Sequence, residues 1–128
     1  MNESGQRSVL IVEDDDDLRS ALEMLLDDDG FEVASAEHGG VALRLLESIE
    51  PDVILLDLNM PVMDGETFAR RYRSQYGASV PIVICTTSPP PSITERIGNV
   101  SLLRKPIELD NLLETVHHLS QPGADSPE

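Results

Sequence analysis

The chain has 128 residues, which is enough for one compact domain of ordinary size. Its 24 acidic and nine basic side chains give a formal net charge of −15, and a negative field of this strength opposes binding to nucleic acid and to anionic membrane surfaces. A single cysteine excludes an intrachain disulfide and a cysteine-rich zinc site. No signal-peptide core or apolar run of membrane-spanning length is present, so we expect a soluble cytoplasmic domain.

Short apolar runs alternate with longer segments of helical period along the chain. The run at 9–12 precedes a predicted helix whose apolar residues lie at 18–26 and which stops at Gly30. The run at 33–36 precedes one whose apolar residues lie at 41–49 and which stops before Pro51. The run at 53–56 precedes a predicted helix over 64–76. The runs at 80–85 and 100–103 follow, and a last helix is predicted over 106–119. The apolar runs lack polar alternation, which is typical of strands covered on both faces.

The segment between the fourth and fifth apolar runs departs from this pattern. It contains three consecutive prolines at 89–91. These cannot lie inside a helix, although the last of them can occupy a first helical position. We therefore expect the fourth helix to be short, over about 92–97, or irregular.

Strictly alternating strands and helices predict a parallel sheet with helices on both faces. Five strands fit a flavodoxin-like, doubly wound α/β fold with strand order 2-1-3-4-5, in which ligands bind beyond the carboxyl ends of the strands. The predicted domain spans 7–119. We expect residues 1–6 and 120–128 to be disordered tails, because they are polar and the second contains proline and glycine.

Polar side chains follow four of the predicted strands at the points where they end. Glu13 and Asp14 follow the first strand, and Asp57 follows the third. Thr86 ends the fourth strand and Lys105 follows the fifth. Because the carboxyl ends of parallel strands meet at one edge of the sheet, we expect these residues to form one site.

The residue types of this site favour magnesium and phosphoryl chemistry. Three carboxylates held together repel one another, and a divalent cation removes that repulsion. Mg²⁺ prefers oxygen ligands. A lysine suits an anionic phosphoryl group, a threonine hydroxyl can donate a hydrogen bond to it, and an aspartate beside the metal can attack phosphorus.

Four segments resemble the receiver domain of two-component response regulators. They are VLIVEDD at 9–15, LLDLNMPVMDG at 55–65, PIVICT at 81–86 and RKP at 104–106. The resemblance covers about residues 7–119. It implies that Asp57 accepts a phosphoryl group from a histidine kinase, a phosphotransfer protein or a small donor. It also implies that Glu13, Asp14, Asp57 and the main-chain carbonyl of Asn59 hold Mg²⁺.

The resemblance assigns further roles around the acceptor. Thr86 and Lys105 would bond the phosphoryl oxygens, and Thr87 is the alternative to Thr86. Pro106 resembles the family's cis-proline, which would direct the preceding lysine into the site. Asn59 and Ser88 resemble positions that set how fast the acyl phosphate hydrolyses.

Two features depart from the family pattern. Receivers usually have a full fourth helix, and they carry an aromatic residue three positions before the site lysine, where this chain has Leu102. The phosphorylation chemistry needs neither feature. Our hypothesis is that the segment 88–99 transmits the signal by becoming ordered or by docking.

The sequence thus predicts a single-domain response regulator, a phosphoprotein of a phosphorelay and not an enzyme, whose phosphorylation switches contacts with a downstream protein target. A receiver belonging to a hybrid kinase has the same residues. Two other functions stay open: a scaffold that is not phosphorylated, and a small Mg²⁺-dependent phosphohydrolase. Haloacid-dehalogenase-like hydrolases place a second acid two residues after the nucleophile, where this chain has Asn59.

Overall fold

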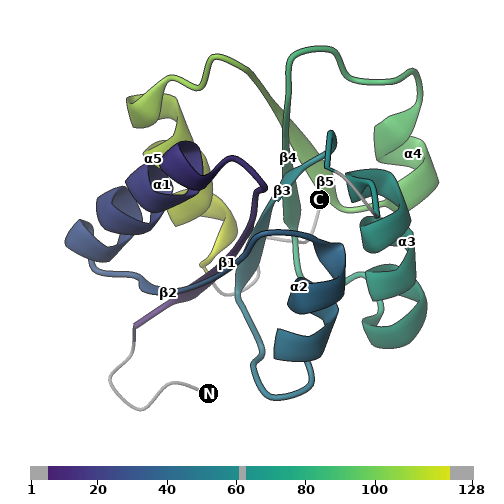
Figure 1. Cartoon of the computed structure of the whole chain (residues 1–128), viewed down its shortest axis with the longest axis horizontal. Helices are drawn as coiled ribbons and strands as arrows, with labels where there is room; N and C mark the ends of the chain where they lie inside the picture. The colour runs from purple at the N-terminus through teal and green to yellow at the C-terminus, as the bar shows by residue number, and fades with distance from the viewer. Residues whose placement is uncertain (1–5, 61–62, 122–128) are drawn as a thin grey trace.

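The computed structural model describes residues 6–60 and 63–121. Strands and helices alternate through this part of the chain (Figure 1), as the sequence predicted. In chain order they are β1 Ser8–Val12, α1 Asp16–Asp28, β2 Glu32–Ala36, α2 Gly39–Leu45, β3 Val53–Asp57, α3 Gly65–Tyr76, β4 Ile82–Thr86, α4 Ile93–Ile97, β5 Val100–Arg104 and α5 Leu109–Leu119.

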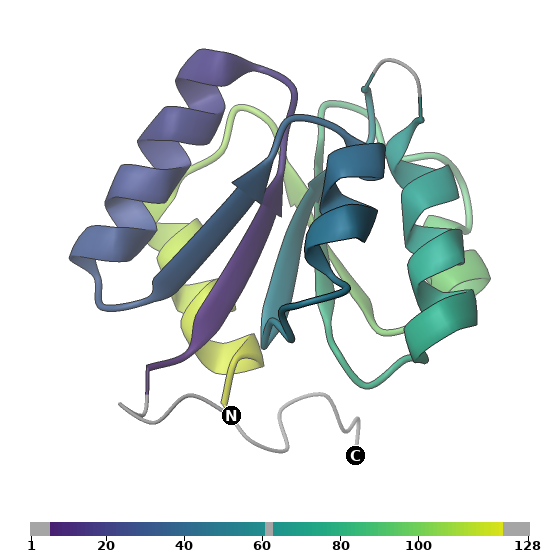
Figure 2. The same ribbon diagram turned by 60° about the horizontal axis from the view of Figure 1, so that its bottom comes forward.

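The strands form one parallel sheet with the predicted order β2-β1-β3-β4-β5. Helices α1 and α5 cover one face of the sheet, and α2, α3 and α4 cover the other (Figures 1 and 2). Each face has its own apolar core. Leu26 and Leu112 belong to the core under α1 and α5, whereas Phe68 and Ile93 belong to the other. This is the flavodoxin-like fold that the alternating pattern predicted.

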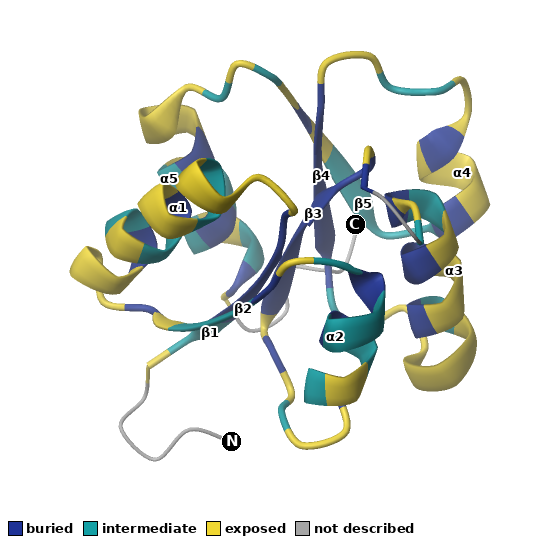
Figure 3. Ribbon diagram, in the orientation of Figure 1, coloured by how far each residue is buried: buried dark blue, intermediate teal, exposed yellow. Residues whose placement is uncertain are grey.

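Burial differs between the centre and the edges of the sheet (Figure 3). Every residue of β3 and β4 is buried, and in β1 only Ser8 is partly exposed. Strands β2 and β5 lie at the two edges and are mostly half-buried or exposed. The expectation that both faces are covered therefore applies fully to the central strands alone.

The end of α2 and the start of α5 lie furthest from their predicted positions. Helix α2 ends at Leu45 because the chain tightens there into turns, with Glu47 N donating to the carbonyl of Arg44 and Ser48 N to that of Leu45. Helix α5 begins at Leu109 and not at Pro106, because residues 105–108 form a loop that ends at the cap residue Glu108.

Helix α4 has five residues, which confirms the expectation of a short fourth helix. Ser92 precedes it with a φ of 61°, and Gly98 ends it with a φ of 82°.

Within residues 6–60 and 63–121, no helix combines the length and the apolar character that crossing a membrane requires.

The predicted tails lie mainly outside the described residues. Gln6, Ser120 and Gln121 are the parts of them that the structure describes. Ser120 is buried, ends α5, and accepts a hydrogen bond at 3.4 Å from the Arg7 guanidinium. The ordered chain therefore continues through Ser120.

Candidate functional site

The carboxyl ends of β1, β3, β4 and β5 bring the predicted site residues to one edge of the sheet. Glu13 and Asp14 directly follow β1, and Asp57 is the last residue of β3. Thr86 is the last residue of β4, and Lys105 directly follows β5. Neighbouring strands run parallel, so residues some 90 positions apart in the chain become neighbours in space.

Three carboxylates form the centre of this site. Glu13, Asp14 and Asp57 each offer an oxygen within 4.8 Å of the other two. Glu13 and Asp57 are both only 3% exposed, whereas Asp14 lies at the surface. The cluster therefore combines buried and accessible oxygens, which suits a hard cation that keeps several of its waters.

Lys105 supplies the positive charge of the site. Its Nζ lies 3.3 Å from Asp57 Oδ1 and 3.4 Å from Glu13 Oε1. The peptide bond from Lys105 to Pro106 is cis, as the sequence resemblance implied. Burial alone would lower the pKa of Lys105, but attraction to the Glu13 and Asp57 carboxylates outweighs burial and raises it. The lysine is therefore charged throughout the physiological pH range.

The acids are costly to ionise together. Burial raises the pKa of Glu13, and the charge of Asp57 adds to the effect, although a hydrogen bond from the Asp15 main chain opposes it. The pKa of Asp14 is raised by desolvation and then by its hydrogen bond to Asp57 and by the charge of that residue. A cation among these oxygens would favour their charged forms. The donor set therefore fits Mg²⁺.

The acidic segment 13–16, between β1 and the start of α1, is held by contacts that the sequence did not predict. Arg19 Nη1 donates to the main-chain carbonyl of Glu13 at 3.0 Å, and its other terminal nitrogen pairs with Asp16 at 2.7 Å. The side chain of Asp15 accepts from Leu18 N at 3.1 Å and so caps α1. Asp15 is thus a cap residue whose main-chain N–H also donates to Glu13 Oε2 at 3.2 Å.

The remaining predicted residues lie around the acceptor. The main-chain N–H of Asn59 donates to Asp57 Oδ1 at 3.2 Å. Thr86 is 1% exposed and its Oγ1 accepts from Ser88 N at 3.3 Å, whereas Thr87 is exposed.

Cys85 is buried, which raises the pKa of its thiol to about 12, so it stays protonated as an apolar filler.

Gly65 packs directly against the backbone that carries the acceptor. A Cβ at this position would lie 2.4 Å from the carbonyl oxygen of Asp57 and 2.6 Å from Cα of Leu58. Gly65 N also donates to the carbonyl of Leu58 at 2.9 Å. The preceding Asp64 caps α3 by accepting from Thr67 N at 2.8 Å. Only glycine allows α3 to approach the acceptor loop this closely.

Replacing Gly65 with alanine is expected to destabilise the domain by about 1–3 kcal/mol, the usual cost of overpacking against backbone that cannot yield. Urea unfolding measures the change. Gly40→Ala is the matched control in α2, because its Cβ would meet only the His38 ring at 3.4 and 3.5 Å. Helix propensity then predicts an unchanged or slightly greater stability for the control. Equal stability of the two variants would contradict the close packing at Gly65.

The sequence model of the response regulator receiver domain matches residues 9–117. The chain belongs to this family. The receiver family is also evident in a curated relative, the transcriptional regulatory protein PrrA of Mycobacterium tuberculosis, which is 38% identical over 116 residues and 87% of this chain. The match covers 48% of that relative, so the chain spans about half the length of the curated relatives it matches.

Solved receiver structures agree with the fold. Chemotaxis protein CheY4 of Vibrio cholerae has a TM-score of 0.84 and 33% identity, with 90% of this chain and 99% of that chain covered. The receiver domain of sensor histidine kinase PA1611 of Pseudomonas aeruginosa, solved with magnesium in its active site cleft, has a TM-score of 0.80 and 28% identity, with 91% and 98% covered.

Membership of the receiver family indicates the general function of the site. Receiver domains are signalling switches and generally not enzymes. They take phosphoryl groups from histidine kinases and bind Mg²⁺ at an acidic site. The acidic cluster of this chain is Glu13, Asp14 and Asp57.

Proposed function

We propose that this receiver is phosphorylated on Asp57 in a Mg²⁺-dependent reaction, by a histidine kinase or a phosphotransfer protein. The phosphorylated receiver domain, residues 7–119, then acts in the cytoplasm as a response regulator that changes its contacts with a downstream protein. One observation carries the proposal: a carboxylate that is 3% exposed lies within 4.8 Å of two further acids and 3.3 Å from a lysine.

The transfer itself is a displacement at phosphorus. An oxygen of the Asp57 carboxylate forms a bond to phosphorus while the P–N bond of the donor phosphohistidine breaks, and the electron pair of that bond returns to the imidazole nitrogen. Lys105 lies where it can offset negative charge on the transferring group. Glu13, Asp14, Asp57 and the Asn59 carbonyl would hold Mg²⁺, which supplies further positive charge.

Labelling with a small phosphoryl donor tests the proposal without knowledge of the kinase. The protein is incubated with acetyl phosphate and Mg²⁺, and intact-mass spectrometry counts the phosphoryl groups gained. We expect one group per chain with Mg²⁺ and none in EDTA. A protein that folds and binds Mg²⁺ but gains no label would support the scaffold function instead.

The phosphohydrolase function is separated in the same sample. Such an enzyme turns over a free phosphomonoester many times, whereas a receiver holds one phosphoryl group and releases it slowly. The absence of a second acid two residues after Asp57, where Asn59 stands, favours the receiver. Sustained release of phosphate from p-nitrophenyl phosphate would favour the hydrolase.

Transmission of the signal is proposed to run through the segment 88–99. Thr86 contacts this segment directly, through the hydrogen bond at 3.3 Å from Ser88 N to Thr86 Oγ1. Further along, Arg96 of α4 pairs with Glu66 of α3 at 2.7 and 3.0 Å. Leu102, which replaces the usual aromatic residue, lies on the edge strand β5 and is 38% exposed. A threonine side chain that turns to donate its hydroxyl to the phosphoryl group would move the oxygen that accepts from Ser88 N, and so alter the segment.

Replacing Thr86 with alanine is therefore expected to leave acetyl phosphate labelling in place but to remove its effect on the segment. Amide hydrogen exchange at Ser88 and over 92–99 measures this, before and after phosphorylation, since the prolines at 89–91 have no amide hydrogen. Thr87→Ala is the control, because Thr87 is exposed. A phosphorylation-dependent exchange change that survives in Thr86→Ala and disappears in Thr87→Ala would assign the role to Thr87.

A further inference from the structure

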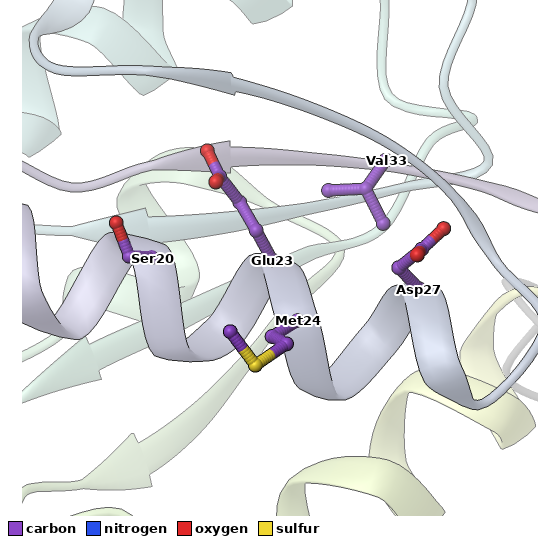
Figure 4. Close-up of a pocket in the computed structure, with 5 residues that line it drawn as sticks. All are labelled: Ser20, Glu23, Met24, Asp27 and Val33. Atoms are coloured by element: carbon purple, nitrogen blue, oxygen red, sulfur yellow. The ribbon is translucent and has the colours of Figure 1, made fainter.

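A groove lies between α1 and the edge strand β2, outside the site described above. It is lined by Ser20, Glu23, Met24 and Asp27 of α1 and by Val33 of β2 (Figure 4). The four helical positions have the spacing of side chains on one face of a helix. Strand β2 lies at one edge of the sheet and pairs only with β1 among the described strands. The groove therefore lies at an open edge of the molecule.

The groove exposes an apolar side chain. Met24 is 67% exposed, more than any other large apolar residue in the described part of the chain, where Leu109 follows at 52%. Val33, which also lines the groove, is half-buried. Methionine is flexible and polarizable, so it adapts to apolar side chains of varied shape.

The polar part of the groove is acidic, and Arg19 of α1 attracts Glu23 without forming an ion pair with it. Among the described residues, no ion pair involves Glu23 or Asp27, and Glu23 bonds only to the hydroxyl of Ser35. The last turn of α1 contains no basic residue, and Asp28 follows directly. Carboxylates at the C-terminal end of a helix are unfavourable to the helix dipole. The charge of Asp27 therefore does not stabilise the end of α1.

We propose that the α1–β2 groove binds a basic, amphipathic segment of a partner protein. An apolar side chain of the partner would pack on Met24 and Val33, and lysine or arginine side chains would pair with Glu23 and Asp27. Charge selects this occupant. A second copy of the chain carries the same net charge of −15 and is repelled, as are nucleic acid and anionic lipid.

A synthetic helical peptide of lysine and leucine, with its leucines on one face, is the probe. Its affinity is measured by calorimetry at physiological salt, where long-range attraction between exposed charges is largely screened. The test variant combines Glu23→Gln, Met24→Ser and Asp27→Asn. The matched control combines Glu108→Gln, Leu109→Ser and Asp110→Asn at the start of α5. It removes the same charge and one exposed apolar side chain, outside the groove.

The groove variant is expected to bind the probe about tenfold or more weakly, the effect of losing a central apolar anchor with its charged neighbours. The control variant is expected to lose much less. Amide shifts in the wild type are expected to change along 20–35. Equal weakening in the two variants, or equal binding of a probe whose leucines are replaced by serine, would overturn the proposal, because net charge alone would then explain the binding.

The proposal stands apart from the proposed function, because the groove contains no residue of the phosphoryl site. Asp57→Asn is expected to bind the probe as the wild type does. A failure of acetyl phosphate labelling would therefore leave the groove proposal standing, and failure of peptide binding would leave the phosphorylation proposal standing.

Discussion

Replacing Asp57 with asparagine is expected to abolish labelling by acetyl phosphate. An amide cannot form the acyl phosphate, while it retains the size of the carboxylate beside Lys105 Nζ, which lies 3.3 Å from Asp57 in the native site. Intact-mass spectrometry of the Mg²⁺-loaded protein measures the result. The variant is also expected to fold, because it removes one of three mutually repelling acids from the buried cluster.

The control for this experiment is Asp64→Asn in the same sequence motif. Asp64 caps α3, and asparagine caps a helix nearly as well as aspartate, so labelling is expected to stay unchanged. If Asp57→Asn kept a full phosphoryl group, the acceptor would have to be another residue, and the proposed chemistry of Asp57 would be wrong.

Replacing Asp14 with asparagine is expected to weaken Mg²⁺ binding by at least about tenfold. Changes to residues that only support the metal ligands already weaken binding by about this factor or more, and Asp14 is proposed as a ligand itself. Calorimetric titration with Mg²⁺ measures the affinity. Asp17→Asn is the matched control, because Asp17 is an exposed acid in the first turn of α1 and lies outside the acidic cluster. Unchanged affinity in Asp14→Asn would remove this residue from the proposed ligand set.

The same variant is expected to be more stable than the wild type in EDTA at neutral pH. Desolvation and the hydrogen bond to Asp57 raise the pKa of Asp14 in the folded state. The folded protein therefore binds more protons than the unfolded chain in this window, and stability falls as pH rises through the raised pKa. Asparagine carries no charge at any of these pH values, so the variant does not lose stability by this route. Thermal unfolding from pH 4 to pH 8 is expected to show a smaller decline for the variant.

Magnesium is expected to reverse the difference. A ligand that binds only the folded state adds about 2.7 kcal/mol at a hundredfold excess over its dissociation constant. The wild type should gain this stability, and Asp14→Asn should gain little at the same concentration. A variant that is less stable than the wild type in EDTA, yet equally stabilised by Mg²⁺, would contradict the repulsion assigned to the three acids.

The fold and the position of the site were predictable because they depend on regular patterns. Unbroken apolar runs such as 53–56 mark central strands, and the alternation with helices fixes a parallel sheet. Once strand order is known, residues at strand ends such as Asp57 and Lys105 must meet. The proline run likewise predicted a short α4, because proline cannot lie within a helix.

What the sequence did not reveal depends on packing at close range. The predicted start of α5 at Pro106 was wrong, because the spacing of apolar residues alone cannot distinguish the first turn of a helix from the loop 105–108. The contact of Arg19 with the Glu13 carbonyl at 3.0 Å requires a long side chain to reach back over one turn, which no motif marks. The close approach of Gly65 to Asp57 is likewise a packing contact that the motif at 55–65 does not reveal.

A crystal structure with Mg²⁺ and beryllofluoride, a mimic of the phosphoryl group, is the most direct test of the central claim. We expect the beryllofluoride on a carboxylate oxygen of Asp57, one Mg²⁺ among the oxygens of Glu13, Asp14 and Asp57, and the Lys105 ammonium against the fluorides. A structure with Mg²⁺ bound elsewhere, or with Asp57 unmodified at saturating beryllofluoride, would contradict the claim that this aspartate carries the phosphoryl group.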